Sequence, residues 1–75
     1  SQTKPFQQQV TAAETNMAKL ELERDALNRE LLALPSADKL ADIGRRLKGI
    51  DDELAGAETK WLEASQAIEA LTEQA

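Results

Sequence analysis

The sequence predicts an all-α fold, a two-helix antiparallel coiled-coil hairpin, on three observations. Apolar residues recur at alternating spacings of three and four along nearly the whole chain, which is the pattern of a coiled-coil seam. The composition is 41% hydrophobic but only 3% aromatic, and it is rich in Ala, Leu, Glu, Gln and Lys, as in long helices. Pro35 and Ser36 interrupt the helical pattern near the middle of the chain. The partner of each helix is therefore expected within the same chain.

The first helix is expected over residues 5–34. Pro5 suits a first helical position, because its missing N–H would be unpaired there in any case. The seam of this helix contains one polar residue, Arg24. Its apolar members are Phe6, Val10, Ala13, Met17, Leu20, Leu27, Leu31 and Leu34.

A short reversal over residues 34–37 and a second helix over residues 37–74 are expected next. Pro35 disfavours helical geometry at Leu34, and Ser36 is a good N-cap for the second helix. So short a connection makes neighbouring helices antiparallel. The seam of the second helix consists of Leu40, Ile43, Leu47, Ile50, Leu54, Ala57, Trp61, Ala64, Ile68, Leu71 and Ala75.

The register of the two helices follows from residue sizes. If the numbers of facing seam residues add up to 74, every seam residue of the first helix has a partner. Leu34 then faces Leu40, and the bulky Trp61 faces the small Ala13, so that each layer is filled without overpacking. Two helices cannot cover an indole fully, so one edge of Trp61 is expected to be exposed.

Arg24 is the oddity of the seam, opposite Ile50 in this register. We expect its side chain to reach out to the carboxylates on either side, to neutralise them and to fix the register. The alternative is a role in ligand binding. The carboxylates form like-charge pairs across the helices, and they are Glu21 with Asp51 and Glu23 with Glu53.

Two ion pairs within the helices are also expected, Asp25 with Arg29 and Asp42 with Arg46. Each joins residues four apart in the favourable orientation and adds only a few tenths of a kcal/mol. Such pairs support the helices and do not indicate a function.

Composition and motifs argue against catalysis. The chain has no Cys and no His, which excludes disulfides, thiolate chemistry and imidazole acid–base catalysis. Carboxylates on solvated helices, without a pocket or a glycine-rich loop, cannot set up acid–base or metal chemistry, and there is no P-loop segment. We therefore expect no enzyme activity in this chain, no cofactor, no metal and no small-molecule substrate. No apolar run approaches the roughly 20 residues of a membrane span and no secretory leader opens the chain, so a soluble cytoplasmic protein is expected.

The charges are unevenly distributed along the chain. The net charge is −5, yet residues 29–48, around the reversal, hold five basic and three acidic side chains. One interpretation is an ordinary solvated surface. The other is a basic tip that contacts phosphates at the end of an acidic stalk. The candidate nucleic-acid-binding residues of this tip are Arg29, Lys39, Arg45, Arg46 and Lys48.

The second helix resembles the end of the C-terminal coiled-coil domain of ABC-F family ATPases, the Uup- and YheS-like ABC transporter ATP-binding proteins. The resemblance rests on Glu53, Leu54, Ala57, Glu58, Trp61, Leu62, Glu63, Ala64, Ile68, Glu69 and Leu71, which are similar to an "ExxWLExxxxLE" pattern. The start of the chain, with Thr3, Lys4, Pro5, Phe6 and Val10, is similar to the start of the first helix in that family. The reversal departs from the family, whose longer reversal carries an aromatic residue.

The resemblance implies that the chain is the C-terminal arm of a larger ATPase whose two ATP-binding cassettes would precede Ser1. ABC-F proteins act on ribosomes as translation factors, and in some branches this arm is linked to nucleic-acid binding. We therefore expect a non-catalytic interaction arm that contacts ribosomal RNA, ribosomal protein or DNA through its basic tip, as a monomer rather than a homo-oligomer. The alternative is a structural or oligomerisation coiled coil with protein partners only, in which two hairpins form a four-helix bundle.

Overall fold

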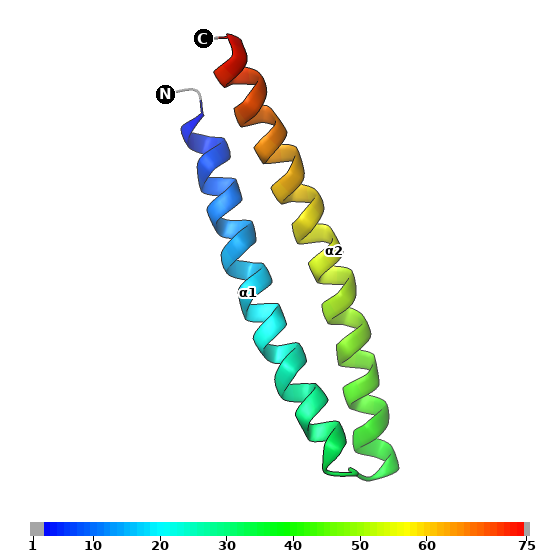
Figure 1. Ribbon diagram of the computed structural model, residues 1–75. Coiled ribbons are helices and arrows are strands. Elements are labelled where there is room, and N and C mark those ends of the chain that lie inside the picture. Colours follow the sequence, from blue (N-terminus) through cyan, green and yellow to red (C-terminus); the bar gives the residue numbers. More distant parts are fainter. Residues whose placement is uncertain (1–2, 75) are drawn as a thin grey trace.

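The protein is a hairpin of two long helices that lie side by side (Figure 1). The computed structural model describes residues 3–74. Helix α1 is Lys4–Leu32 and helix α2 is Ala37–Gln74, and α1 begins at the same end of the hairpin at which α2 finishes. The Cα atoms span 58 × 15 × 14 Å. The predicted all-α hairpin with antiparallel helices is confirmed.

The helix boundaries differ from the expected ones mainly at the end of α1. Helix α2 begins at Ala37, directly after the predicted cap Ser36, whose Oγ accepts a bond from the N–H of Lys39 at 3.4 Å. Helix α1 begins at Lys4, so Pro5 lies in its first turn. It ends at Leu32, whereas the sequence predicted Leu34. Ala33 is the C-cap, and the next residue, Leu34, has left the helix before Pro35 is reached.

The core is a thin line of seam residues in the middle of the hairpin. Among residues 3–73, every residue that is buried belongs to the predicted seam. Leu20, Ile50 and Leu54 form the central cluster, and Met17 and Leu27 pack against it. Ile50 is fully buried, with an exposed fraction of 0%. The buried residues are Ala13, Leu20, Ile43, Ile50, Leu54, Ala57 and Ala64.

The register is supported by contacts at two levels. Leu20 shares the central cluster with Leu54, as predicted. Further from the reversal, the Trp61 indole Nε1–H donates to Glu14 Oε2 at 3.4 Å, which places Trp61 beside the neighbour of its predicted partner Ala13. The exposed fraction of Trp61 is 36%, so the expected exposed edge is present.

The predicted seam layer nearest the reversal is wrong. Leu34 is 89% exposed and Leu40 is 49% exposed, so the two do not form a buried layer. The reason is the backbone of Leu34, whose φ of 54° lies in the left-handed region. A residue outside the helix cannot continue the helical spacing, and its side chain therefore leaves the seam.

Candidate interaction site at the tip

The reversal is built by one strained residue between two ordinary helix ends. The N–H of Ala33 bonds to the carbonyl of Glu30 at 3.1 Å, and the N–H of Leu34 bonds to that of Leu31 at 3.2 Å. Leu34 then turns into the left-handed region, which is usually occupied by Gly after a helix because a side chain costs about 1 kcal/mol there. On the other side, the N–H of Leu40 bonds to the carbonyl of Ser36 at 2.8 Å. The tip is thus well bonded, and its strain is confined to Leu34.

This tip exposes large apolar side chains. Leu32 and Leu34 are 83% and 89% exposed, and Leu40 on the first turns of α2 is half exposed. Isolated exposed leucines are common, but these three lie near one another in the sequence around the reversal, where exposed apolar side chains are candidates for contact with a partner. The spacing of three and four residues placed Leu34 and Leu40 in the seam, so the sequence did not predict their exposure. We call Leu32, Leu34 and Leu40 the leucine tip.

The five predicted basic residues lie around the tip in several directions. Successive helical residues are rotated by roughly 100°, so Arg45, Arg46 and Lys48 cannot share one face of α2. Arg29, Lys39 and Lys48 are exposed, and no ion pair involves any of them within residues 3–74. Arg45 pairs with Asp42, one turn away on the same helix. The structure therefore brings the five residues to one end of the hairpin without gathering them into one patch.

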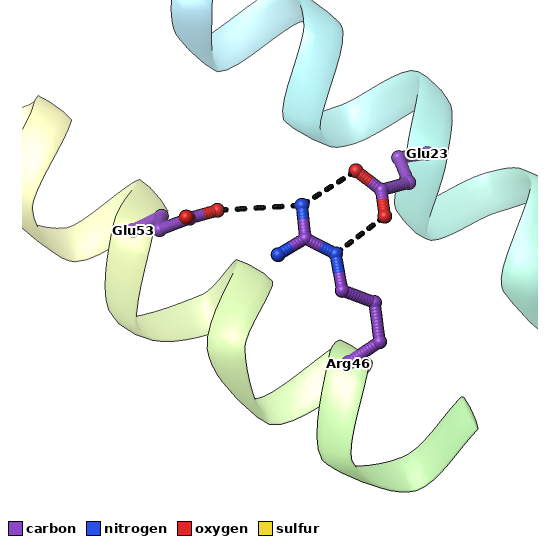
Figure 2. Close-up of polar contacts among 3 residues, drawn as sticks. All are labelled: Glu23, Arg46 and Glu53. Carbon is purple, nitrogen blue, oxygen red and sulfur yellow. Dashed lines mark hydrogen bonds and ion pairs between the residues drawn. The ribbon is translucent and has the colours of Figure 1, made fainter. Parts of the chain in front are cut away.

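Arg46 is held by carboxylates of both helices (Figure 2). Its Nε donates to Glu23 Oε2 at 2.5 Å and its Nη2 to Glu23 Oε1 at 2.7 Å, which is the two-pronged geometry of a strong arginine–carboxylate pair. The same Nη2 lies 3.6 Å from Glu53 Oε2. One guanidinium from α2 thus joins a carboxylate on α1 to a second carboxylate on its own helix.

This arrangement shifts the titration of both partners. The hydrogen bond from Arg46 lowers the pKa of Glu23 below its ordinary value of 4.5, and desolvation opposes the shift only in part. The hydrogen bond to Glu23 raises the pKa of Arg46 further above its already high ordinary value. Both side chains are about two-fifths exposed, so solvent screens the pair. Arg46 therefore mainly joins the two helices, and carboxylates of the same chain already neutralise its charge.

Arg46, and not Arg24, is the arginine that neutralises the carboxylates Glu23 and Glu53. Glu23 and Glu53 share a cation, as expected for a like-charge pair across the seam, but Arg24 forms no ion pair with either of them among the described residues. A sequence signal for Arg46 existed. Arg46 and Glu53 are seven residues apart and so occupy the same position of the repeat, beside the seam, as Glu23 does on α1.

The ion pairs predicted within the helices are wrong. Asp42 pairs with Arg45, three residues away, and not with Arg46, whose guanidinium is turned toward α1. No contact between Asp25 and Arg29 occurs among the ion pairs of residues 3–74. Pairs of this kind contribute little at exposed sites, so a competing carboxylate across the seam easily redirects an arginine.

The described part of the chain offers neither a metal site nor a membrane span. Within residues 3–74, no three acidic side chains are arranged so that they could hold a metal ion. Neither helix, over the same residues, has an apolar stretch long enough to cross a bilayer. Comparison of the chain with protein-family models, with curated proteins and with solved structures found no match. The similarity to ABC-F arms therefore stays a prediction from the sequence.

Proposed function

We propose that the hairpin is a non-catalytic interaction arm of an ABC-F-like ATPase and that it contacts nucleic acid or a ribosomal surface through its tip. The observation that carries the proposal is the exposure of Arg29, Lys39 and Lys48 within residues 29–48, where five basic side chains outnumber three acidic ones. Cations that lack a partner within the chain attract phosphates, whereas the acidic stalk repels them.

The expected contact is weak and indifferent to sequence. The tip carries no aromatic side chain to stack on bases, so binding rests on phosphate contacts alone. Such binding depends steeply on salt, and we expect the affinity for an RNA or DNA duplex to fall by roughly an order of magnitude or more between ~50 and ~200 mM salt.

The test is a titration of a labelled RNA duplex, and separately of a DNA duplex, into the protein at low salt. The Lys39→Glu/Lys48→Glu variant removes two exposed tip cations that lie off the seam, and Lys4→Glu/Gln7→Glu/Gln8→Glu makes the same change in net charge far from the tip. Arg46 is left in place because its replacement would also disturb the contact between the helices. We expect the tip variant to lose at least about tenfold in affinity and the control to lose less, with equal helicity by circular dichroism. Equal binding by the two variants, or none by the native chain, would rule out nucleic-acid contact at the tip.

The leucine tip favours a second candidate, contact with a protein surface. Leucine side chains gain nothing against phosphates, but they supply about 25 cal/mol for each Å² that an apolar groove covers. If this candidate holds, Leu32→Ser/Leu34→Ser abolishes partner binding by the arm while the lysine substitutions have a smaller effect. The two variants together therefore separate the two classes of partner.

A further inference from the structure

A groove of about 970 Å³ runs along one side of the seam, over the middle of the hairpin. Its lining includes small residues from both helices, with Ala13 and Ala57 buried and Ala12 and Gly56 exposed. A Cβ added at Gly56 would meet nothing within 4 Å, so contacts inside the hairpin give no reason for a glycine there. A glycine within a helix lowers helix stability, but it lets another backbone approach closely.

The rim of this groove is electrically neutral on an acidic protein. It carries three cations and three carboxylates, whereas the whole chain has a net charge of −5. A neutral strip presents no repulsion to a second acidic chain, while the rest of the surface does. We call this surface the neutral groove. Its charged residues are Lys19, Glu23, Arg46, Glu53, Lys60 and Glu63.

One pair of oppositely charged residues in the groove is self-complementary. Glu53 and Lys60 lie on either side of Gly56, and both are exposed. If a second copy is turned end for end about a two-fold axis beside Gly56, Glu53 of each copy meets Lys60 of the other. Helix α2 is Ala37–Gln74, so this axis crosses it close to its midpoint and the two copies overlap along their length. A surface that matches itself under a two-fold rotation is what a symmetric dimer requires.

The ends of the hairpin favour the same antiparallel arrangement. The tip over residues 29–48 has more basic than acidic side chains, and the remainder of the chain has four basic and eleven acidic ones. Turning the second copy end for end places each basic tip beside the acidic open end of the other copy. It also makes every pair of neighbouring helices antiparallel, which is favourable for the helix dipoles.

The accessible surface of the hairpin is large enough to include an interface of standard size. The hairpin exposes 5620 Å², whereas area scaling gives roughly 4,500 Å² for a compact monomer of 8.2 kDa. The excess of roughly 1,100 Å² exceeds the ~800 Å² that each partner buries in a standard interface.

We infer that the neutral groove binds a second copy of the same hairpin, antiparallel to the first, and that the dimer is a four-helix bundle. The two copies approach most closely at Gly56, and Glu53 of each copy pairs with Lys60 of the other. The inference departs from the monomer expected from the sequence. Its test needs no partner for the tip, so its outcome is read separately from that of the nucleic-acid titration.

Exchange of the charges at Glu53 and Lys60 tests whether these two residues pair between copies. Sedimentation equilibrium from micromolar to millimolar concentration should show a dimer for the native chain, and Lys60→Glu or Glu53→Lys alone should weaken it by about tenfold or more, because each places like charges together. An equimolar mixture of the two variants should restore the dimer, since every contact then joins opposite charges. Lys4→Glu, which makes the same charge change outside the groove, should have a smaller effect than Lys60→Glu.

A larger side chain at Gly56 tests whether the two copies approach closely at this residue. Gly56→Met should prevent dimerisation, whereas Gly44→Met should not, because Gly44 is equally free of neighbours within the chain but lies outside the groove. Both variants should keep their helices, as measured by circular dichroism. A native chain that stays monomeric at millimolar concentration would overturn the inference. So would a dimer that Gly56→Met leaves intact, or a mixture of the charge variants that associates no better than either alone.

Discussion

The middle of the hairpin and its tip follow the same heptad repeat, but a seam leucine is buried in the middle and exposed at the tip. Leu20 and Leu34 both occupy predicted seam positions, yet Leu20 is 6% exposed and Leu34 is 89% exposed. Around Leu20 both helices are regular, and Ile50 and Leu54 lie opposite. At Leu34 the backbone has left the helix because Pro35 follows. A heptad position thus predicts burial only where the helix continues on both sides and a facing residue exists.

The largest expected difference between the two regions comes from truncating these two leucines. Leu20→Ala removes the centre of the main cluster, and we expect it to lower the free energy of unfolding by roughly 2–5 kcal/mol. Leu34→Ala removes a side chain that is already in solvent and should change it by less than about 0.5 kcal/mol. Urea denaturation followed by circular dichroism measures both. Similar losses for the two variants would show that the leucine tip is buried in solution.

A second test lies at the level of Trp61, which the predicted register pairs with the small Ala13. Ala13 is 8% exposed, so Ala13→Leu should force the indole outward and lower the free energy of unfolding by about 1–3 kcal/mol through overpacking. Trp61 is the one tryptophan of the chain, so its fluorescence reports the displacement directly. A stabilised Ala13→Leu variant with unchanged emission would mean that the register is different.

The sequence predicts the hairpin well because its determinants are local. The spacing of three and four residues, Pro35 and Ser36 decide where helices form and which faces meet, and none of these depends on long-range detail. The choice of cation for Glu23 was missed for the opposite reason. Arg24 is nearer to Glu23 in the sequence, but Arg46 reaches it from α2 in a two-pronged geometry, and that preference emerges only once both helices are in place. The leucine tip was missed because the repeat alone does not show where the backbone leaves the helix.

Arg24→Leu tests the one polar residue in the predicted seam of α1, at a position where the heptad repeat would place an apolar side chain. Arg24 is partly buried and takes part in no ion pair within residues 3–74, so its replacement loses no salt bridge and gains apolar contact near Ile50. We expect the free energy of unfolding to stay the same or rise by up to about 1.5 kcal/mol in urea denaturation. A loss above roughly 3 kcal/mol would indicate a buried ion pair at Arg24.

Leu34→Gly tests the strain at the tip. Glycine adopts the left-handed conformation without cost, so this variant should gain up to about 1 kcal/mol in the free energy of unfolding. If the leucine tip binds a partner, the same variant should bind more weakly although it is more stable. Thermal melts measure the stability, and titration with a partner measures the affinity, on the same protein preparation. Asn, which also tolerates this conformation, is the control for loss of the leucine side chain without the extra backbone freedom of glycine.

The smallest effect concerns the pair of Glu23 with Arg46, and pH separates it from the packing terms. The pKa of Glu23 is lower in the folded chain than its ordinary value of 4.5, so folding is favoured by this group above that pH. The contribution is lost as the pH falls through the lowered folded pKa, because Glu23 is then protonated in both the folded and the unfolded state. Glu23→Gln should therefore be less stable than the native chain at neutral pH, and the difference should shrink below pH 4.5 and vanish at still lower pH. Glu21→Gln is the matched control, since Glu21 has no cation partner among the described residues, and it should show no such loss at neutral pH. A difference between Glu23→Gln and the native chain that persists unchanged in acid would assign it to packing at this position and not to the charge of the carboxylate.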